Sequence, residues 1–256
     1  MVTFETKCYE NDWEFILKGS YLRQMIARCN YPFSHRVVMI NNVRNKSKVC
    51  RYADKKIREG VIDAYYIVDD YAKTALEFFE IRPGSFHGGY YYSIAELVSI
   101  YLCNTEYLIH FSGDSFPDDN QSTWISDAIN IFSERSDIVV ANANWDKEFI
   151  LAAEESFDSI NDFFLGFGFS DQCYLIRTKD FRKPIYNEHH EVSVRYPEYG
   201  GELFEKRVDS YMRNHNLYRL TSKKSSYTHR NFPNNKWERL RVKWNLFFAG
   251  RRSLPK

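Results

Sequence analysis

The sequence lacks any apolar run long enough to cross a membrane, and it lacks paired cysteine motifs. No stretch approaches the roughly 18 consecutive apolar residues of a membrane-spanning helix. The five cysteines are widely scattered, with no CxxC or Cys/His spacing suited to zinc, which favours a reducing compartment. The first residues show neither the basic nor the apolar region of a secretory signal. We therefore expect a cytoplasmic protein.

The sequence also lacks internal repeats and the composition of a disordered chain. Its 256 residues are 44% hydrophobic and 27% charged, with a mean hydropathy of -0.53, which suits a sizeable core beneath a polar surface. Aromatic residues reach 17%; they fit core packing, and tyrosines also stack on or hydrogen-bond polar ligands such as sugars. At roughly 100–200 residues per domain, the length predicts one large domain, placed at 1–232, and an appendage at 233–256.

The net charge of +1 hides a strongly basic C-terminal segment. Residues 213–256 carry twelve Lys and Arg against one acid, a net charge of +11, which leaves −10 on the rest of the chain. Such a segment suits an anionic partner such as phosphate, an acidic glycan or a membrane surface, although a solvated basic face explains it equally well. Within it, 236–248 has the spacing of an amphipathic helix, whose apolar stripe could instead close the core or form a homodimer contact. The stripe consists of Trp237, Leu240, Trp244 and Phe247.

Short apolar runs alternate with helix-like stretches over the first two thirds of the chain, which is the pattern of an α/β fold. Because open α/β sheets bind ligands outside the carboxyl ends of their strands, the polar residues that follow these strands mark a candidate nucleotide site. The pattern predicts strands over 2–6, 35–40, 64–68, 107–111, 137–143 and 172–177, with a short one near Tyr218. It predicts helices over 12–29, 47–59, 91–103, 123–133, 201–213 and 236–248. Between the strand at 137–143 and Phe167 it predicts a loop-rich stretch.

The order of these pieces over residues 2–230 resembles a GT-A-fold glycosyltransferase, with the layout of the family 2 glycosyltransferases. The run TEYLIHFSGDS is similar to the strand that ends in the family's DXD motif, with Asp114 at the final acidic position and Ser112 where the first Asp would stand. The resemblance implies that Ser112, Gly113 and Asp114 hold the donor diphosphate and that Asp114 binds Mg²⁺ or Mn²⁺. One carboxylate can suffice, because Mg²⁺ keeps several waters and uses one or two carboxylates plus phosphates. Alternatively, Asp114 is a turn residue that hydrogen-bonds its own backbone.

The run YPEYGGELFE resembles the segment that delivers the catalytic base in this family, with Glu202 and Glu205 in place of the usual Glu-Asp pair. The two glycines before Glu202 favour that residue, because glycine allows close approach of the backbone to a ligand. The family's helix length, counted back from Tyr218, favours Glu205 instead. We prefer Glu202, while noting that acids in a first helical turn are also favoured simply by the helix dipole.

The run Tyr227-Thr-His229 resembles the strand that closes the active site in this family. The resemblance implies that His229 lies on the metal or near the diphosphate, and a neutral imidazole can ligate Mn²⁺. A histidine satisfied within the structure is an equally good interpretation.

The resemblance also implies a donor site on the turns that follow the first three strands. Residues after the first strand would contact the base and ribose. An asparagine after the second strand stands where the family has a base-reading acid, and an amide can pair with a nucleobase edge through both its donor and its acceptor. An aspartate after the third strand is an alternative ribose contact, although acids at strand ends often only cap helices. The candidates are Thr6, Lys7 and Tyr9 for the first turn, Asn41 and Asn42 for the second, and Asp69 for the third.

Four further residues are candidates for the acceptor side. Asp171 and Gln172 open a strand that resembles the family's acceptor-side strand, and both could hydrogen-bond acceptor hydroxyls. Trp145 or Tyr199 could stack on a sugar face, although Trp145 is equally suited to core or loop packing.

The resemblance therefore implies an α/β protein with a GT-A (Rossmann-like) nucleotide-diphospho-sugar transferase fold and a C-terminal amphipathic helical extension. Its implied activity is metal-assisted, inverting transfer of a sugar from a nucleotide-diphosphate donor to a hydroxyl acceptor, a glycan or lipid-linked glycan of polysaccharide biosynthesis. The basic helix at 236–248 could carry the enzyme to an anionic membrane surface as a peripheral protein. The alternative is a nucleic-acid-binding protein that uses the basic aromatic tail; the acidic remainder and the missing RNA-binding motif argue against it.

Overall fold

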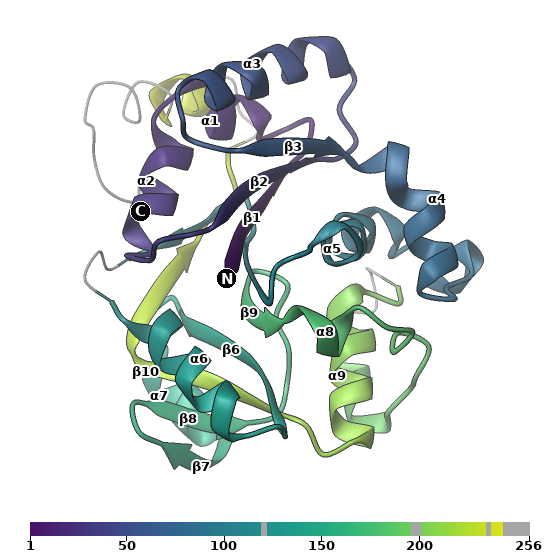
Figure 1. Ribbon diagram of the computed structural model, residues 1–256, viewed down its shortest axis with the longest axis vertical. Coiled ribbons are helices and arrows are strands. Elements are labelled where there is room, and N and C mark those ends of the chain that lie inside the picture. The colour runs from purple at the N-terminus through teal and green to yellow at the C-terminus, as the bar shows by residue number, and fades with distance from the viewer. Residues whose placement is uncertain (119–121, 196–200, 234–236, 243–256) are drawn as a thin grey trace.

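The parallel half of the sheet contains the N-terminal strands. The computed structural model describes residues 1–118, 122–195, 201–233 and 237–242. Its strands form one ten-stranded sheet, in which the first four lie parallel in the order β3-β2-β1-β4 (Figure 1). Near-continuous apolar runs such as Val-Val-Met-Ile in β2 form these strands, because both faces of a parallel sheet are buried. The strands are β1 (Val2–Cys8), β2 (His35–Ile40), β3 (Ala64–Ile67) and β4 (Tyr107–Phe111).

The second half of the sheet contains antiparallel strands that return the chain to the same edge. Strand β9 lies antiparallel between β4 and β6, so that Cys173 at its start pairs with Phe111 at the end of β4. Strand β10 runs parallel to β6, and its last residues pair with β5. The ends of β1, β4 and β10 and the start of β9 therefore meet at one edge. The strands are β5 (Ser115–Pro117), β6 (Ile138–Trp145), β7 (Ser156–Ile160), β8 (Phe163–Gly166), β9 (Cys173–Arg177) and β10 (Tyr218–His229).

Helices cover both faces of this sheet and divide the core into two apolar clusters. One cluster holds α1 (Trp13–Lys18), α2 (Tyr21–Arg28), α3 (Lys46–Arg58) and α6 (Trp124–Glu134). The other holds α4 (Val68–Phe78), α5 (Tyr90–Leu102), α8 (Thr178–Phe181) and α9 (Phe204–Asn214). Helix α7 (Phe149–Glu154) contributes no buried residue, and two short 3₁₀ helices span Pro83–Phe86 and Glu191–Arg195.

The structure confirms the predicted strands at 35–40 and 107–111 and corrects several other predictions. The helix predicted over 12–29 is two helices, because Gly19 adopts an extended conformation between them. The strand predicted over 64–68 ends at Ile67, and Asp69 lies in the first turn of α4, a helix that was not predicted. The stretch predicted to be loop-rich contains α7 and the hairpin of β7 and β8, whose outer strand is mostly exposed and therefore lacks a buried apolar face. The strand predicted near Tyr218 continues for 12 residues.

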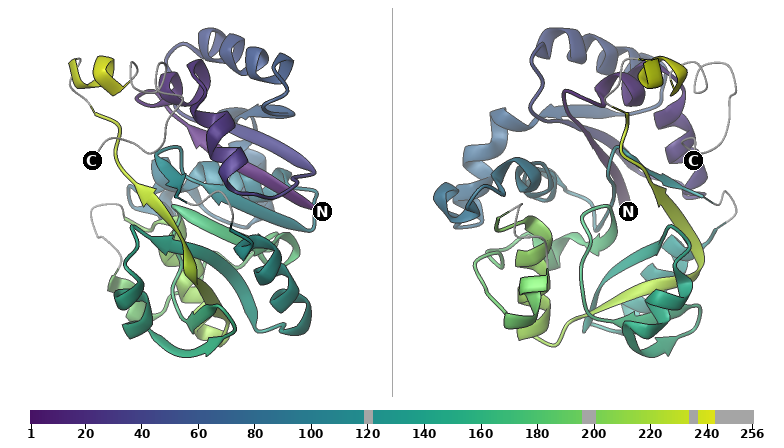
Figure 2. Two further views of the ribbon diagram at one scale, coloured as in Figure 1. Left: turned by 90° about the vertical axis from the view of Figure 1, so that its left-hand side faces the viewer. Right: turned by 180° about the vertical axis from the view of Figure 1, so that it is seen from behind.

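The described residues of the C-terminal segment pack on the N-terminal helices. Residues 237–242 are helical and lie near α1 (Figure 2). Arg239 donates to the carbonyl oxygen of Asn11 at 2.8 Å, and Val242 is buried. Trp237 is 80% exposed and Leu240 is also exposed, so these two members of the predicted stripe do not close the core. The other two members of the stripe, Trp244 and Phe247, lie outside the described residues.

No helix among the described residues is both long enough and apolar enough to span a bilayer.

The turn between β4 and β5 packs tightly against the chain that follows β1. A Cβ atom on Gly113 would lie 2.7 Å from the carbonyl oxygen of Lys7 and 2.5 Å from Cδ1 of Ile16. Both distances are far below van der Waals contact, and the first neighbour is backbone that cannot rotate away. Glycine is therefore required here by close approach, and this approach fixes the position of Asp114.

We expect Gly113→Ala to lower the free energy of unfolding by about 1–3 kcal/mol, because the added methyl group overpacks the turn. Urea denaturation followed by circular dichroism measures the change. Gly84→Ala is the matched control, since nothing lies within 4 Å of a Cβ at that position, and its effect should stay within about 0.5 kcal/mol. Equal stability of the two variants would contradict the close packing of this turn.

Candidate active site

Asp114 and His229 face each other where β4 and β10 end. The pairing of β5 with the end of β10 sets His229 opposite Ser115, directly after Asp114. Oδ1 of Asp114 is 3.5 Å from Nδ1 of His229, and the carbonyl oxygen of Asp114 accepts a hydrogen bond from the backbone of Arg230 at 3.1 Å. Burial raises the pKa of Asp114, while His229 and Lys7 act in the opposite direction. The pair is thus a largely buried carboxyl group beside an imidazole.

A second pair of carboxyl groups, Asp171 and Glu205, lies beside this first pair. Glu205 occupies the first turn of α9 and accepts a hydrogen bond from the backbone of Asp171. Burial, with the charge of Asp171 adding to it, raises the pKa of Glu205 to about 8. Ser112 joins the two turns, because its hydroxyl donates to the carbonyl oxygen of Asp171 at 3.1 Å. Burial is the main cause of the raised pKa of Asp114, and the charge of Asp171 adds to it.

Glu202, the preferred base from the sequence, lies elsewhere. Its Oε1 is 2.6 Å from Nζ of Lys206 one helical turn later, and its backbone N–H donates to the carbonyl oxygen of Phe86. Both contacts hold Glu202 at the start of α9 beside the 3₁₀ helix at Pro83–Phe86. The structure therefore brings Glu205, and not Glu202, into contact with Asp171.

A buried lysine lies among these carboxyl groups. Lys7, at the end of β1, pairs with the carboxylate of Glu96 on α5. Burial alone would lower the pKa of Lys7, but Glu96, Asp171 and Glu5 raise it above its ordinary value, so the ammonium group stays charged. The carboxylate of Glu96 therefore holds this ammonium group. Glu96 was not predicted as a site residue, although a charged residue inside an apolar helical run is an unusual signal.

These contacts define what we call the carboxyl cluster. Its members influence one another's pKa values, and its five carboxyl groups outnumber the three basic groups around them, which are Lys7, His229 and the nearby Arg239. Burial raises the pKa values of Asp12 and Glu96 as well, as expected for carboxylates that lack sufficient positive charge around them. The cluster consists of Asp12, Glu96, Asp114, Asp171 and Glu205.

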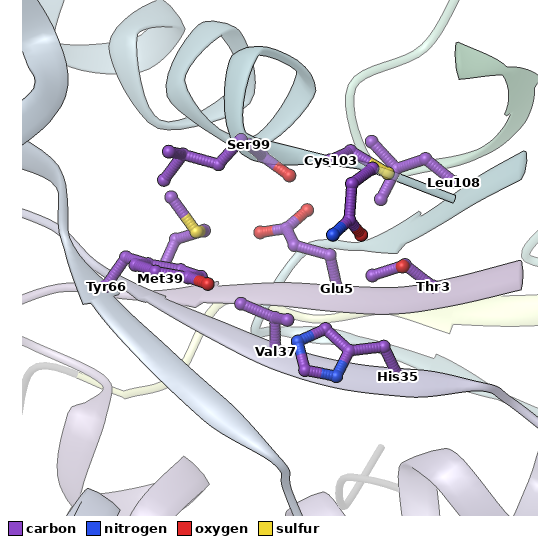
Figure 3. Close-up of a pocket in the computed structure, with 11 residues that line it drawn as sticks. Thr3, Glu5, His35, Val37, Met39, Tyr66, Ser99, Cys103 and Leu108 are labelled. Carbon is purple, nitrogen blue, oxygen red and sulfur yellow. The ribbon is translucent and has the colours of Figure 1, made fainter. Parts of the chain in front are cut away.

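A buried pair supports the β4–β5 turn from inside the sheet. Oε2 of Glu5 is 2.5 Å from Nδ1 of His110, and Nε2 of His110 is 3.4 Å from the hydroxyl oxygen of Ser112. His110 also stacks on Tyr174, with ring centroids 4.8 Å apart. Figure 3 shows Glu5 extending from β1 toward Ser99 and Cys103 of the α5 region, where a cavity of about 50 Å³ lies. The pair connects β1 and β4 to the turn that carries Asp114.

Four of the predicted donor-side residues, Thr6, Tyr9, Asn41 and Asn42, lie at or just after the ends of β1 and β2. Thr6 is fully buried, and Asn42 has a left-handed φ of 48°. The rings of Tyr9 and Tyr91 meet edge to face, with centroids 6.3 Å apart. Next to them Asn41 donates to the carbonyl oxygen of Tyr91 at 3.4 Å, while its own side-chain oxygen is buried without a hydrogen-bond partner.

Asp69, the remaining donor-side candidate, forms an ion pair with Lys46 at 2.8 Å at the start of α4. This pair lies where β3 ends and α4 begins, and among the described residues Asp69 forms no hydrogen bond or ion pair with the carboxyl cluster. On the acceptor side, Trp145 and Gln172 line one pocket of about 360 Å³ beneath α7. Tyr199 lies outside the described residues.

The residues at Asp114 and His229 fit a divalent cation. A carboxylate and an imidazole are both ligands of Mn²⁺, and the raised pKa of Asp114 marks a carboxylate that needs more positive charge. Within the described part of the chain, no three His, Cys, Asp or Glu side chains form a complete metal site. Such a cation would therefore need additional ligands from a phosphate group or water, as is usual for Mg²⁺ beside nucleotides.

Comparison with known proteins establishes the fold. No protein-family model and no curated protein matches the sequence. A solved structure of GalNAc-T7 with UDP, GalNAc and Mn²⁺ is similar over 90% of this chain and 43% of that chain, with 10% identity and a TM-score of 0.53. UDP-glucose pyrophosphorylase complexed with UDP-glucose is similar over 89% of this chain and 92% of that chain, with 9% identity and a TM-score of 0.50.

The chain therefore has the GT-A fold that the sequence predicted, and that prediction is confirmed. One of these two proteins is named a pyrophosphorylase and the other is GalNAc-T7, so the fold alone does not decide the reaction. The functional conclusion must come from the carboxyl cluster and its surroundings.

We expect the stability of the protein to fall as the pH rises from about 4.5 to 8, in part because of Glu205. The folded protein keeps the proton on Glu205 up to about pH 8, whereas the unfolded chain loses it near its ordinary pKa of about 4.3. The unfolded state therefore binds fewer protons in this window, and one such proton lowers the free energy of unfolding by up to about 1.4 kcal/mol per pH unit.

Glu205→Gln removes this contribution, so its stability should exceed that of the wild type by a margin that grows from pH 5 to pH 8. Urea denaturation at several pH values measures the margin. Glu202→Gln, whose carboxylate lies beside Lys206, should follow the wild-type pH dependence in parallel. A constant difference between Glu205→Gln and the wild type would show that Glu205 is not buried in this way.

Proposed function

We propose that this protein transfers a sugar from a nucleotide-diphosphate donor to a hydroxyl group of an acceptor. The observation that carries the proposal is the meeting of Asp114 and His229 with Asp171 and Glu205 at the carboxyl edge of the parallel sheet. This is the edge at which open α/β sheets bind their ligands. The fold shared with GalNAc-T7, whose solved structure contains UDP, GalNAc and Mn²⁺, supports the same conclusion.

The charge of the carboxyl cluster supports a metal-dependent donor site. A diphosphate brought next to these carboxylates would be repelled, unless a cation were bound with it. Asp114 and His229 are the residues that would hold Mg²⁺ or Mn²⁺. When bound, such a cation offsets the negative charge that develops on the departing diphosphate.

The donor nucleotide would lie along the ends of β1 and β2. The unpartnered side-chain oxygen of Asn41 can accept a hydrogen bond from a nucleobase edge. The rings of Tyr9 and Tyr91 next to it can bound the same site. In this assignment the nucleobase lies near Asn41, at one end of this edge of the sheet, and the diphosphate lies at Asp114.

Glu205 is the residue best placed to act as the base. In the reaction, the acceptor oxygen forms a bond to the anomeric carbon, and the bond from that carbon to the diphosphate oxygen breaks. The electron pair leaves with the nucleoside diphosphate, and the proton of the acceptor hydroxyl goes to the Glu205 carboxylate. Attack opposite the leaving group inverts the anomeric centre. With a pKa of about 8, the ionised Glu205 is a stronger proton acceptor than an ordinary carboxylate.

Nucleotidyl transfer, the reaction class of UDP-glucose pyrophosphorylase, suits this site less well. A triphosphate needs backbone or cationic groups that cradle its phosphates. The turn after β1, residues 9–12, contains no glycine and no basic residue, and it carries Glu10 and the buried Asp12. Nucleic-acid binding is likewise disfavoured at this edge by the excess of carboxyl groups.

We expect the protein to bind UDP or GDP only weakly without Mn²⁺ and at least about tenfold more tightly with it, because the metal offsets the charge of the carboxyl cluster. Isothermal titration of each nucleotide with and without Mn²⁺ measures the effect. Asp114→Asn should abolish the Mn²⁺ dependence, while Asp158→Asn, an exposed carboxylate on β7, should preserve it. Metal-independent binding of both nucleotides would contradict the donor site.

We expect Glu205→Gln to lower turnover by about 10²–10⁴-fold while the affinity for the nucleotide stays near that of the wild type. Release of nucleoside diphosphate from a panel of uridine and guanosine diphosphate sugars measures turnover. Glu202→Gln is the matched control, and it should retain most of the activity because Glu202 is engaged with Lys206. The opposite pattern, with loss of turnover in Glu202→Gln alone, would move the base to Glu202.

A further inference from the structure

A pocket beneath α7 opens next to the carboxyl cluster. It has a volume of about 360 Å³, at the lower end of the range of about 300–1,000 Å³ for ligand pockets. Residues of β6 and β10 form one side of the pocket, and residues of α7, which contacts β6 and β7, form another. We call it the α7 pocket; Asn142, Asn144, Trp145, Gln172, Arg219 and Thr221 are among the residues that line it.

The lining of the α7 pocket is rich in groups that both donate and accept hydrogen bonds. Asn142, Asn144 and Gln172 contribute amides, and Thr221 and Tyr227 contribute hydroxyl groups. A sugar hydroxyl is itself both a donor and an acceptor, so such a lining complements it. Trp145 stands at the pocket with 46% of its surface exposed, which leaves its ring available to an incoming ligand.

The charges in the pocket disfavour an anionic ligand. Arg219 is the basic side chain of the lining, and Nη2 of Arg219 already lies 3.7 Å from a carboxylate oxygen of Glu155. Glu148 lines the pocket as well, so its acids outnumber its base. A phosphate or carboxylate ligand would be repelled here, whereas an uncharged polar ligand would not.

Two polar atoms of the lining lack partners that a ligand could supply. The side-chain oxygen of Asn144 and Nε of Arg219 are both buried without a hydrogen-bond partner. Buried polar groups in native proteins are nearly always hydrogen-bonded, so each such atom calls for an explanation. One accepts and the other donates, which matches the two capacities of a hydroxyl group.

One short segment connects the α7 pocket with the carboxyl cluster. Ser170 and Gln172 line the pocket, and Asp171 between them contacts Glu205. Gln172 also accepts a hydrogen bond from the hydroxyl group of Tyr227 at 3.3 Å, two residues before His229. A ligand in the pocket therefore lies next to the residue assigned as the base.

We propose that the α7 pocket binds the acceptor and that the acceptor is an uncharged saccharide. A ring face of the sugar lies on Trp145, and its hydroxyl groups bond to Asn144, Gln172 and Arg219. One hydroxyl group remains directed past Asp171 toward Glu205. This inference rests on the proposed sugar transfer and names the class of molecule that receives the sugar.

Saturation-transfer NMR and isothermal titration on the full chain, with UDP and Mn²⁺ present, test the proposal. The probes are the methyl glycosides of glucose, galactose and mannose, with glucuronate and 3-phosphoglycerate as charged comparators. At least one neutral glycoside should bind saturably, and the two anions should bind at least about tenfold more weakly or not at all. Tighter binding of either anion, or no binding of any neutral glycoside, overturns the proposal.

Two variants assign the binding to the α7 pocket. Trp145→Ala should weaken the affinity for the neutral glycoside by about tenfold or more, and Asn144→Leu should reduce it further. Phe157→Ala, at another exposed aromatic residue on β7 outside the lining, is the matched control and should bind like the wild type. Unchanged affinity in Trp145→Ala and Asn144→Leu overturns the assignment.

The binding of UDP itself separates this proposal from the one on which it rests. If the wild type binds UDP with Mn²⁺ but binds no neutral glycoside, the acceptor assignment alone is wrong. If the wild type binds neither UDP nor GDP with Mn²⁺, the proposed sugar transfer is itself wrong.

Discussion

The active edge of this protein depends on one buried cation, the ammonium group of Lys7. Several carboxyl groups approach one another here from the start of α1, α5, the β4–β5 turn, the chain before β9 and α9, and like charges that are buried close together repel strongly. Lys7 pairs with Glu96 directly and acts on Asp171 and Glu205 as well, which lets the carboxyl groups remain together without a ligand. The excess of carboxyl groups over basic groups that remains is one basis for the proposed metal ion.

The reversed direction of β9 places Asp171 at the same edge of the sheet as Asp114. In a wholly parallel sheet, β9 would begin at the opposite edge. Asp171 would then lie on the opposite side of the molecule from Asp114. Because β9 runs antiparallel between β4 and β6, its first residues stand beside the last residues of β4. Ser112 then joins the two turns through its hydrogen bond to Asp171. Sheet topology thus brings together Asp114, which we propose to hold the metal, and Asp171, which contacts the proposed base Glu205.

Much of the fold could be predicted from the sequence, because the buried strands of a parallel sheet are continuous apolar runs, as in β2 and β4. The hairpin of β7 and β8 and the long β10 could not, since Ser156–Ile160 is mostly exposed and the middle of β10 is Ser-Lys-Lys-Ser-Ser. At the site, the resemblance to the family 2 glycosyltransferases indicated Asp114 and His229. The glycines before Glu202 led us to prefer that residue over Glu205. The sequence does not show that Glu205 contacts Asp171 while Glu202 pairs with Lys206. The role of Glu96 depends on a partner 89 residues away, which no local pattern contains.

The exposure of helix α7 affects which residues of such a protein can be substituted. It covers the pocket beside the carboxyl cluster, yet none of its residues is buried and the core clusters do not include it. Residues in such a roof can be exchanged at little expense to folding, while each exchange alters the shape and polarity seen by the molecule below. Divergence toward new acceptors, in nature or in a directed library, can therefore be concentrated in residues 149–154 without disturbing the residues that perform the chemistry.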